Sequence, residues 1–236
     1  SGKLGESSLL QGDTRSFNRY MLGGATEVEI DSIGRVLIPD FLRERASLKE
    51  KVAVVGVQSR VELWNEKQWQ KVQLEAIERC VYSFEILGEK DLLTNIVTGG
   101  GKTTVIGAMI AYMMIVHDQY KFLILTPNTI VRERLVDEFD QHSESYIYDV
   151  FPFFVNSHEH LKNKISLHVM KPSESAAGVR AGTIILGNIH QIYERTDNWK
   201  ILRDNVDSLC IFNDEAHNSK AEQYNDLMAK LRPKRF

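Results

Sequence analysis

Residues that could bind a polyphosphate gather in one short stretch, residues 95–104, where an apolar run ends in consecutive glycines. Consecutive glycines let the backbone turn tightly with its N–H groups pointing inward, and a helix that follows adds the positive end of its dipole. In such a loop a lysine reaches the β- and γ-phosphates, and a hydroxyl holds Mg²⁺. The stretch therefore predicts a phosphate-binding loop; the alternative is a glycine turn before an ordinary core helix. The residues expected to hold the nucleotide are Thr98, Gly99, Gly100, Gly101, Lys102, Thr103 and Thr104, with Lys102 also catalytic and Thr103 also a magnesium ligand.

Two neighbouring carboxylates, Asp214 and Glu215, directly follow the apolar residues 209–212. The apolar run predicts a central strand, and ligands bind at the carboxyl ends of strands in open α/β sheets. We expect Asp214 to hold Mg²⁺ through water and Glu215 to be the catalytic residue that orients or deprotonates an attacking water. His217 would couple the nucleotide state to the rest of the protein. Alone, this acidic tetrapeptide can simply begin a helix; downstream of the phosphate loop, it predicts that both motifs share one magnesium–triphosphate pocket.

Helix and strand patterns alternate between these two motifs. Residues 91–98 predict a buried strand, residues 104–116 a uniformly apolar helix, and residues 121–126 a second strand. Thr129 is expected to cap a helix over residues 130–140. This alternation predicts α/β architecture with right-handed crossovers in a doubly wound parallel sheet.

The segment between that helix and the acidic motif is less regular. Residues 146–154 are aromatic and apolar and predict a strand or a small hydrophobic lid, whereas residues 157–160 predict a solvated loop rather than a metal site. Residues 182–191 predict a strand followed by a polar turn, and they include Asn188 and Gln191.

The first seventy residues carry a different pattern. Residues 28–31 and 35–38 predict a hairpin closed by a turn at Gly34, and residues 40–46 predict a short helix. Two further strands are expected at residues 52–57 and 61–64, and a helix capped by Asn65 should then run without a break to Val81 or Phe84.

Within this part, Asp31, Gly34, Arg35 and Pro39, with the closing pair Trp64 and Trp69, resemble the second half of MraZ, a SpoVT/AbrB-type family of transcriptional regulators. The resemblance implies a β-rich swapped-hairpin unit that dimerises and contacts DNA through basic residues around the hairpin. The nucleic-acid contacts expected here are Arg35, Arg15 and Arg43. Acidic residues are interspersed with them, so a solvated surface of mixed charge is the alternative.

The phosphate loop has Ile96 where an outer glycine is usual, and it lies downstream of a Gln-Leu-Glu-Ala-Ile segment that begins at Gln73. Together with the acidic motif, these features resemble the first RecA-like domain of a superfamily 2 DEAD/DEAH-box helicase, in the branch of the type III restriction subunits. The resemblance implies a RecA-like P-loop sheet flanked by helices, in which Gln73 contacts adenine. It also implies that Pro127, Asn128 and Arg132 contact nucleic acid, and it extends that role to Asn188 and Gln191.

Composition constrains the partners. The net charge of −3 gives no bulk attraction to nucleic acid, so any such contact must come from local basic groups. Cys80 and Cys210 predict reduced, buried thiols, and the apolar residues 105–116 are too few to span a membrane. These features predict a cytoplasmic protein without membrane contact, and a bacterial nucleoid-associated one if the resemblance holds.

Three segments are expected: a poorly ordered lead-in (1–16), an MraZ/AbrB-like DNA-binding domain (17–70) and a RecA-like helicase ATP-binding domain (71–236). The first hypothesis is the ATP-binding domain of a superfamily 2 DNA helicase, translocase or restriction-type subunit that uses ATP, Mg²⁺ and DNA. Its hydrolysis should be weak without the arginine finger of a second RecA-like domain or subunit. The alternative is an MraZ-like DNA-binding regulator that carries a nucleotide-binding domain and forms a homodimer through its N-terminal domain.

Overall fold

A computed structural model describes residues 26–57, 60–96, 101–149, 159–193, 196–214 and 221–231. The chain divides into two compact units, residues 1–70 and 71–236. The predicted lead-in and six predicted site residues lie outside the described residues. Those six residues are Arg15, Thr98, Gly99, Gly100, Glu215 and His217.

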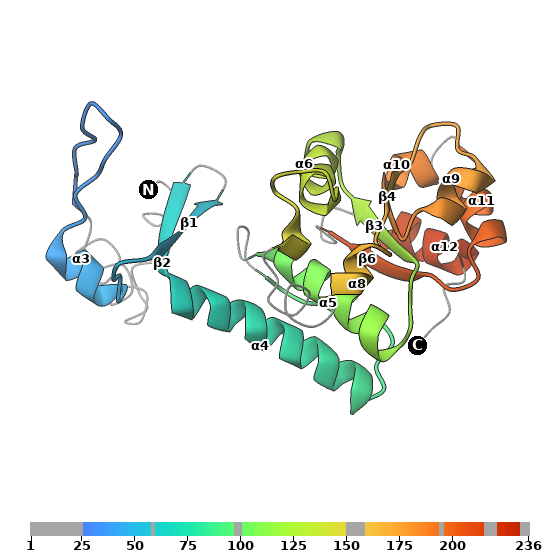
Figure 1. Cartoon of the computed structure of the whole chain (residues 1–236), viewed down its shortest axis with the longest axis horizontal. Coiled ribbons are helices and arrows are strands. Elements are labelled where there is room, and N and C mark those ends of the chain that lie inside the picture. Colours follow the sequence, from blue (N-terminus) through green and yellow to red (C-terminus); the bar gives the residue numbers. More distant parts are fainter. Residues whose placement is uncertain are drawn as a thin grey trace, which may run out of the picture. The chain divides into compact units, whose positions relative to one another are not determined.

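The first unit contains three elements that the sequence predicted (Figure 1). They are helix α3 (Asp40–Arg45) and the antiparallel strands β1 (Val52–Val57) and β2 (Arg60–Asn65). The predicted hairpin over residues 28–38 is shorter than expected, since its two arms meet in a single bridge between Ile30 and Val36.

The turn between those arms explains the spacing of Asp31, Gly34 and Arg35. The Asp31 Oδ1 atom accepts the backbone N–H groups of Ile33 at 3.1 Å and Arg35 at 2.8 Å. Gly34 has a φ of 84°, which glycine adopts without the strain of a side chain. The backbone N–H and the guanidinium of Arg35 lower the pKa of the Asp31 carboxyl. The spacing of these residues therefore has a local structural reason, the formation of this turn, in addition to the family resemblance that it carries.

Helix α4 (Glu66–Glu85) begins where the sequence predicted it. The backbone N–H of Gln68 donates to Asn65 Oδ1 at 3.2 Å, as expected for a capping asparagine. The division between the two units falls within this helix.

A parallel sheet organises the second unit, as predicted. Its order is β4 (Leu167–Val169), β5 (Ile184–Asn188), β3 (Phe122–Thr126) and β6 (Cys210–Asn213). Two expectations are wrong. The acidic motif follows β6, which was expected to be a central strand. In the described sheet β6 is an edge strand, and it is half-buried. Residues 91–96 form no strand and are largely exposed.

Helices cover both faces of this sheet because β3 and β5 are apolar on both sides (Figure 1). Phe122 and Ile124 pack into one core cluster, and Leu123 and Leu125 pack into another. The first cluster includes α5 (Lys102–Val116), α6 (Thr129–Phe139), the 3-10 helix η1 (Ile147–Asp149) and α8 (Glu159–Lys162). The second includes α9 (Ala176–Ala181), α10 (Ile189–Ile192), α11 (Asn198–Asn205) and α12 (Ala221–Leu231).

Three local predictions are corrected. Asn128, and not Thr129, caps α6, because its side chain accepts the N–H of Val131 at 3.0 Å. The strand or lid expected from residue 146 is the buried turn η1 in its described part. The polar turn after β5 is the short helix α10. Among the helices that the structure describes, none has the length and apolar content needed to cross a bilayer.

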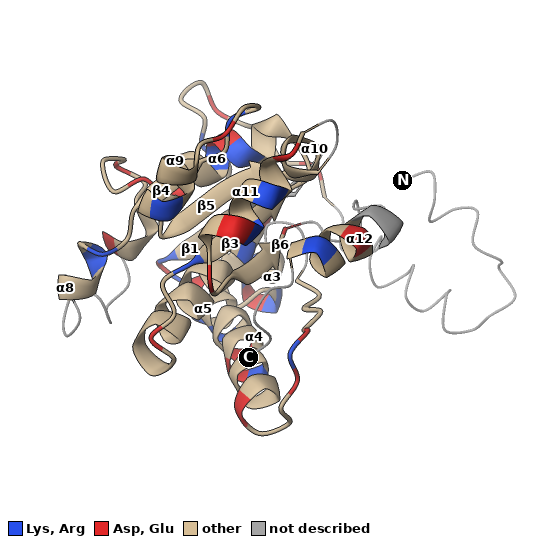
Figure 2. Cartoon of the chain, turned by 90° about the vertical axis from the view of Figure 1, so that its right-hand side faces the viewer, with Lys and Arg blue, Asp and Glu red and all other residues tan. Residues whose placement is uncertain are grey.

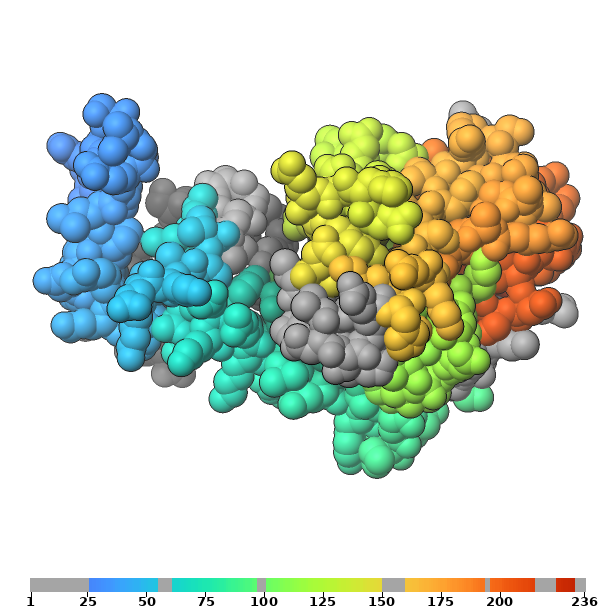
Figure 3. Space-filling model, in the orientation of Figure 1, coloured from blue at the N-terminus to red at the C-terminus, as the bar shows by residue number. Residues whose placement is uncertain are grey.

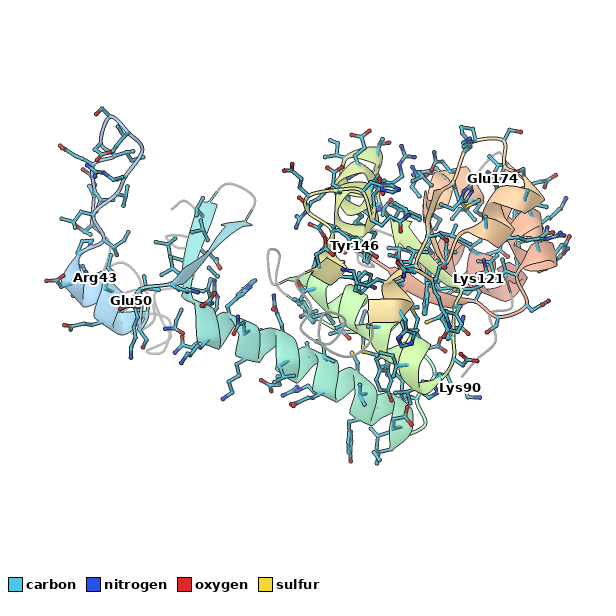
Figure 4. The ribbon with its side chains drawn as sticks, in the orientation of Figure 1. Arg43, Glu50, Lys90, Lys121, Tyr146 and Glu174 are labelled. Atoms are coloured by element: carbon cyan, nitrogen blue, oxygen red, sulfur yellow. The ribbon has the colours of Figure 1, made fainter. Side chains whose placement is uncertain are left out.

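Two neighbouring tyrosines offer a matched test of this core. Tyr148 donates its hydroxyl to the Gly107 carbonyl at 3.1 Å, whereas the buried hydroxyl of Tyr146 (labelled in Figure 4) has no hydrogen-bond partner among the described residues. We expect Tyr148→Phe to lower the free energy of unfolding by about 1 kcal/mol. Tyr146→Phe should leave it unchanged or raise it, because it removes an unpaired polar group. Urea unfolding followed by circular dichroism measures both, and equal losses would contradict the assignment.

Candidate nucleotide and nucleic-acid site

The carboxyl ends of three parallel strands bring predicted site residues to one edge of the sheet. Thr126 pairs with Asn188 across β3 and β5, and Leu125 pairs with Asn213 across β3 and β6. The backbone N–H of Asp214 donates to the Leu125 carbonyl at 2.9 Å. Asp214 therefore stands directly past the end of β6, where it was expected.

Helix α5 begins toward the same edge. It ends at Val116, and residues 117–121 lead directly into the amino end of β3. A helix of this length, rising ~1.5 Å per residue, must run back along the strand from the carboxyl edge. Lys102, Thr103 and Thr104 thus occupy the first helical turn near that edge, and all three are half-buried.

Gly101 precedes this turn in a conformation that favours glycine. Its φ is 78° and ψ is 36°, and it stands at the N-cap of α5, where a glycine supplies no capping side chain. A Cβ atom placed on Gly101 would lie 2.0 Å from the Nε2 atom of Gln73. The Gln73 side chain of α4 therefore lies against the backbone of the predicted phosphate loop.

The predicted nucleic-acid residues of the second unit also meet at the carboxyl edge. Asn128 caps α6 directly after β3 and Pro127, while Asn188 caps α10 directly after β5. The Arg132 Nη1 atom donates to Gln191 Oε1 at 3.0 Å, so residues from α6 and α10 are joined. Figure 3 shows the yellow-green surface of α6 adjoining the orange surface of the segment from β4 to α10.

A polar network beneath α10 was missed by the sequence analysis. The Asn198 Nδ2 atom donates to the carbonyls of Lys171 at 2.9 Å and Gln191 at 2.8 Å, and Asn198 Oδ1 accepts the Glu174 N–H at 3.3 Å. Glu174, labelled in Figure 4, extends the network to His168 Nε2 at 2.9 Å. These residues have no shared spacing along the chain, so no sequence signal connects them.

The Glu174 carboxylate is almost completely buried, with 2% of its side chain exposed. Burial raises the pKa of Glu174, but hydrogen bonds from the backbone N–H groups of Ser175 and Lys171 and from His168 outweigh it. The pKa therefore lies below its ordinary value of 4.5. The carboxylate form is the one that holds the loop between β4 and α9.

Of the predicted DNA contacts of the first unit, the two that lie among the described residues are each paired with an acid. Arg35 bonds Asp31 at 2.6 Å, and Arg43 bonds Asp40. These pairs are exposed and contribute little to stability, with values of about 0–1 kcal/mol typical. Both guanidinium groups are accessible, and their charges are locally balanced.

A cluster of cations around Trp199 was also missed. The cationic groups of Lys200, Arg203 and Lys230 lie 5.6, 5.1 and 5.4 Å from the indole centroid. Two cavities of about 360 and 480 Å³ adjoin it. Each cation also pairs with a carboxylate, and both blue and red residues lie on α11 and α12 (Figure 2). This neutral cluster joins α11 to α12 and does not form a basic patch.

Two family models match the chain. The model described as "Type III restriction enzyme, res subunit" matches residues 66–236, and the model of the MraZ protein matches residues 21–80. No solved structure matches with statistical significance.

Three similar proteins are transcriptional regulators MraZ. Those of Caldicellulosiruptor saccharolyticus, Natranaerobius thermophilus and Desulforamulus reducens are 39%, 38% and 42% identical to this chain in the aligned part. The alignments cover 36%, 37% and 39% of this chain and 62%, 59% and 63% of the relatives. The chain thus spans less than two thirds of the length of these relatives.

The buried Glu174 carboxylate predicts a pH-dependent stability. Its pKa is lower in the folded than in the unfolded protein, so its contribution is present above pH 4.5 and is lost as the pH falls through the folded value. We expect Glu174→Gln to lower the free energy of unfolding by ~1–2 kcal/mol at neutral pH. The difference from the wild type should shrink in acid. Urea unfolding of both proteins at several pH values measures this difference, and a constant difference would contradict the prediction.

Proposed function

We propose a function that proceeds from one premise: the chain belongs to the family of the type III restriction enzyme res subunit, whose model matches residues 66–236. The second unit binds Mg²⁺–ATP as a helicase-type ATPase and contacts nucleic acid at the carboxyl edge of its sheet. The observation that carries the nucleotide part is the shared edge, toward which the first turn of α5 and Asp214 both lie.

The donor set at this edge fits a magnesium–triphosphate. Lys102 would hold the β- and γ-phosphates, and the Thr103 hydroxyl and the Asp214 carboxylate would hold Mg²⁺, since hard cations prefer oxygen ligands. The left-handed Gly101 at the N-cap of α5 fits a loop that wraps an anion. The bound nucleotide would supply the phosphoanhydride bond, and the metal would neutralise the charge on the phosphates. Glu215 would orient the attacking water.

Gln73 fits the role of an adenine contact because its carboxamide already lies beside Gly101. A carboxamide offers both a donor and an acceptor, as recognition of an adenine edge requires. His217 would couple nucleotide state to nucleic-acid contact. A second RecA-like domain, on the same polypeptide or on another subunit, would supply the arginine that rapid hydrolysis requires.

Nucleic acid would bind where Pro127, Asn128 and Arg132 follow β3. Arg132 is half-buried, and among the described residues it pairs with the neutral Gln191 and with no carboxylate. Its charge is therefore available to a phosphate. Backbone contacts of this kind favour binding without sequence preference.

Lys102→Ala tests the nucleotide site. For the wild type we expect Mg²⁺–ATP to raise the melting temperature, with about 2.7 kcal/mol of stabilisation at a hundredfold excess over Kd. The Lys102→Ala protein should show no such rise, and Lys90→Ala, which removes an exposed lysine from the same unit, should behave as the wild type. Differential scanning fluorimetry measures all three. An unchanged response of Lys102→Ala, or no response of the wild type, would reject the proposed nucleotide site.

A second candidate function is supported by the first unit. We propose that it binds DNA through Arg15, Arg35 and Arg43 as an MraZ-like regulator and self-associates. None of its described side chains is buried, although several are large and apolar. The most exposed are Ile30, Ile33, Leu37, Val54 and Val61. A unit this small buries too little surface alone, so a second copy of the same unit would complete its core.

Leu37→Glu together with Val54→Glu tests this self-association. Leu37 and Val54 are 83% and 67% exposed, and each substitution would remove ~1.5–3 kcal/mol of burial energy if a second copy covers that residue. Sedimentation velocity should show a dimer for the wild type and a monomer for the double variant. Leu93→Glu, at an 88% exposed position of the second unit, should remain dimeric. A monomeric wild type would remove this candidate.

A further inference from the structure

We infer that Gln191 is the positioning residue that orients the Arg132 guanidinium toward a nucleic-acid phosphate and leaves its charge uncancelled. The inference rests on the proposed nucleic-acid contact and assigns Gln191 a role distinct from contact with the ligand.

The Arg132 side chain has one hydrogen-bond partner among the described residues. Its Nη1 atom donates to Gln191 Oε1 at 3.0 Å, and its buried Nε has no hydrogen-bond partner among the described residues. The neighbouring Arg134 instead pairs with the Glu138 carboxylate at 2.9 Å. Within the described part of the chain, Gln191 is therefore the group that fixes the direction of Arg132.

Gln191 is itself held rigidly. Its N–H donates to Asn188 Oδ1 at 2.9 Å, and its Oε1 atom accepts the Asn188 N–H at 3.5 Å, which together form a capping box at the start of α10. Its carbonyl accepts from Thr196 Oγ1 at 2.7 Å and from Asn198 Nδ2 at 2.8 Å. The backbone is fixed by these bonds and the carboxamide oxygen by the Asn188 N–H, so the carboxamide is oriented before any ligand arrives.

The Gln191 carboxamide is a neutral hydrogen-bond acceptor for Arg132. A glutamine oxygen accepts the guanidinium N–H but carries no charge, whereas a carboxylate would form an ion pair and compete with the phosphate. An oriented arginine with a neutral partner keeps its full attraction for an anion and loses less side-chain entropy when it binds. The ligand class implied is a phosphodiester, which DNA and RNA share.

Two substitutions at Gln191 separate positioning from stability. Gln191→Met keeps the size and removes the acceptor, and Gln191→Glu keeps the acceptor and adds the charge. We expect both to weaken binding of fluorescent oligothymidylate about tenfold, as Arg132→Ala does, although Gln191→Glu should keep the wild-type melting temperature. The plot of log affinity against log salt has a negative slope, and the magnitude of this slope should decrease by about 0.7 in each variant. Arg180→Ala, which removes an exposed arginine just before the amino end of β5, should bind as the wild type.

The double variant Gln191→Met with Arg132→Ala gives the decisive comparison. If Gln191 acts through Arg132, the double variant binds no more weakly than Arg132→Ala alone. Additive losses, or wild-type binding by Gln191→Met, would overturn the inference and leave the nucleic-acid site standing. Wild-type binding by Arg132→Ala would instead reject the proposed site itself. Equal losses with oligouridylate indicate that the phosphodiester is recognised, and a loss confined to one polymer would overturn the assigned ligand class.

Discussion

The parallel pairing of β3 with both β5 and β6 is the constraint on which the candidate site depends. Parallel strands end at the same edge, so the segments after Thr126, Asn188 and Asn213 must emerge together although they are far apart in sequence. The apolar side chains on both faces of β3 and β5 are completely buried and stabilise the pairing. The sheet therefore positions the candidate site residues that follow its strands.

Polar groups buried at this edge would be costly without partners. Asn188 and Asn198 are 8% and 3% exposed, and an unpaired buried polar group costs about 1–3 kcal/mol. The side chains of both form hydrogen bonds, to the N–H of Gln191 and to three neighbouring carbonyls respectively. A helix as short as α10 is unstable alone, so these bonds and the buried Ile192 keep it in place. Rigidity at the edge thus follows from satisfied polar groups as much as from packing.

Sequence patterns correctly predicted the elements that depend on local periodicity. They failed for features that depend on pairing between segments distant in sequence. The apolar α5 and β3 and the helix capped by Asn65 were confirmed because their signals are long or chemically specific. The cap of α6 was misplaced by one residue because Asn128 and Thr129 can both cap a helix. The position of β6 in the sheet was wrong because no local signal reports strand order. The link from Arg132 to Gln191 joins two helices, and only the fold brings them together.

The first unit illustrates the opposite limit, in which local hydrogen bonds are satisfied but the described residues form no buried core. Asp31 closes its turn and pairs with Arg35, but exposed ion pairs contribute about 0–1 kcal/mol and cannot hold a fold. Each large apolar side chain left in water forgoes ~1.5–3 kcal/mol, and Ile30, Leu37 and Val54 are all exposed. Burial of these side chains would contribute more than the ion pairs, so the stability of the unit would depend mainly on what covers them. In the proposed dimer, a second copy would offer the same apolar residues in return and would add a second set of the accessible guanidinium groups of Arg35 and Arg43.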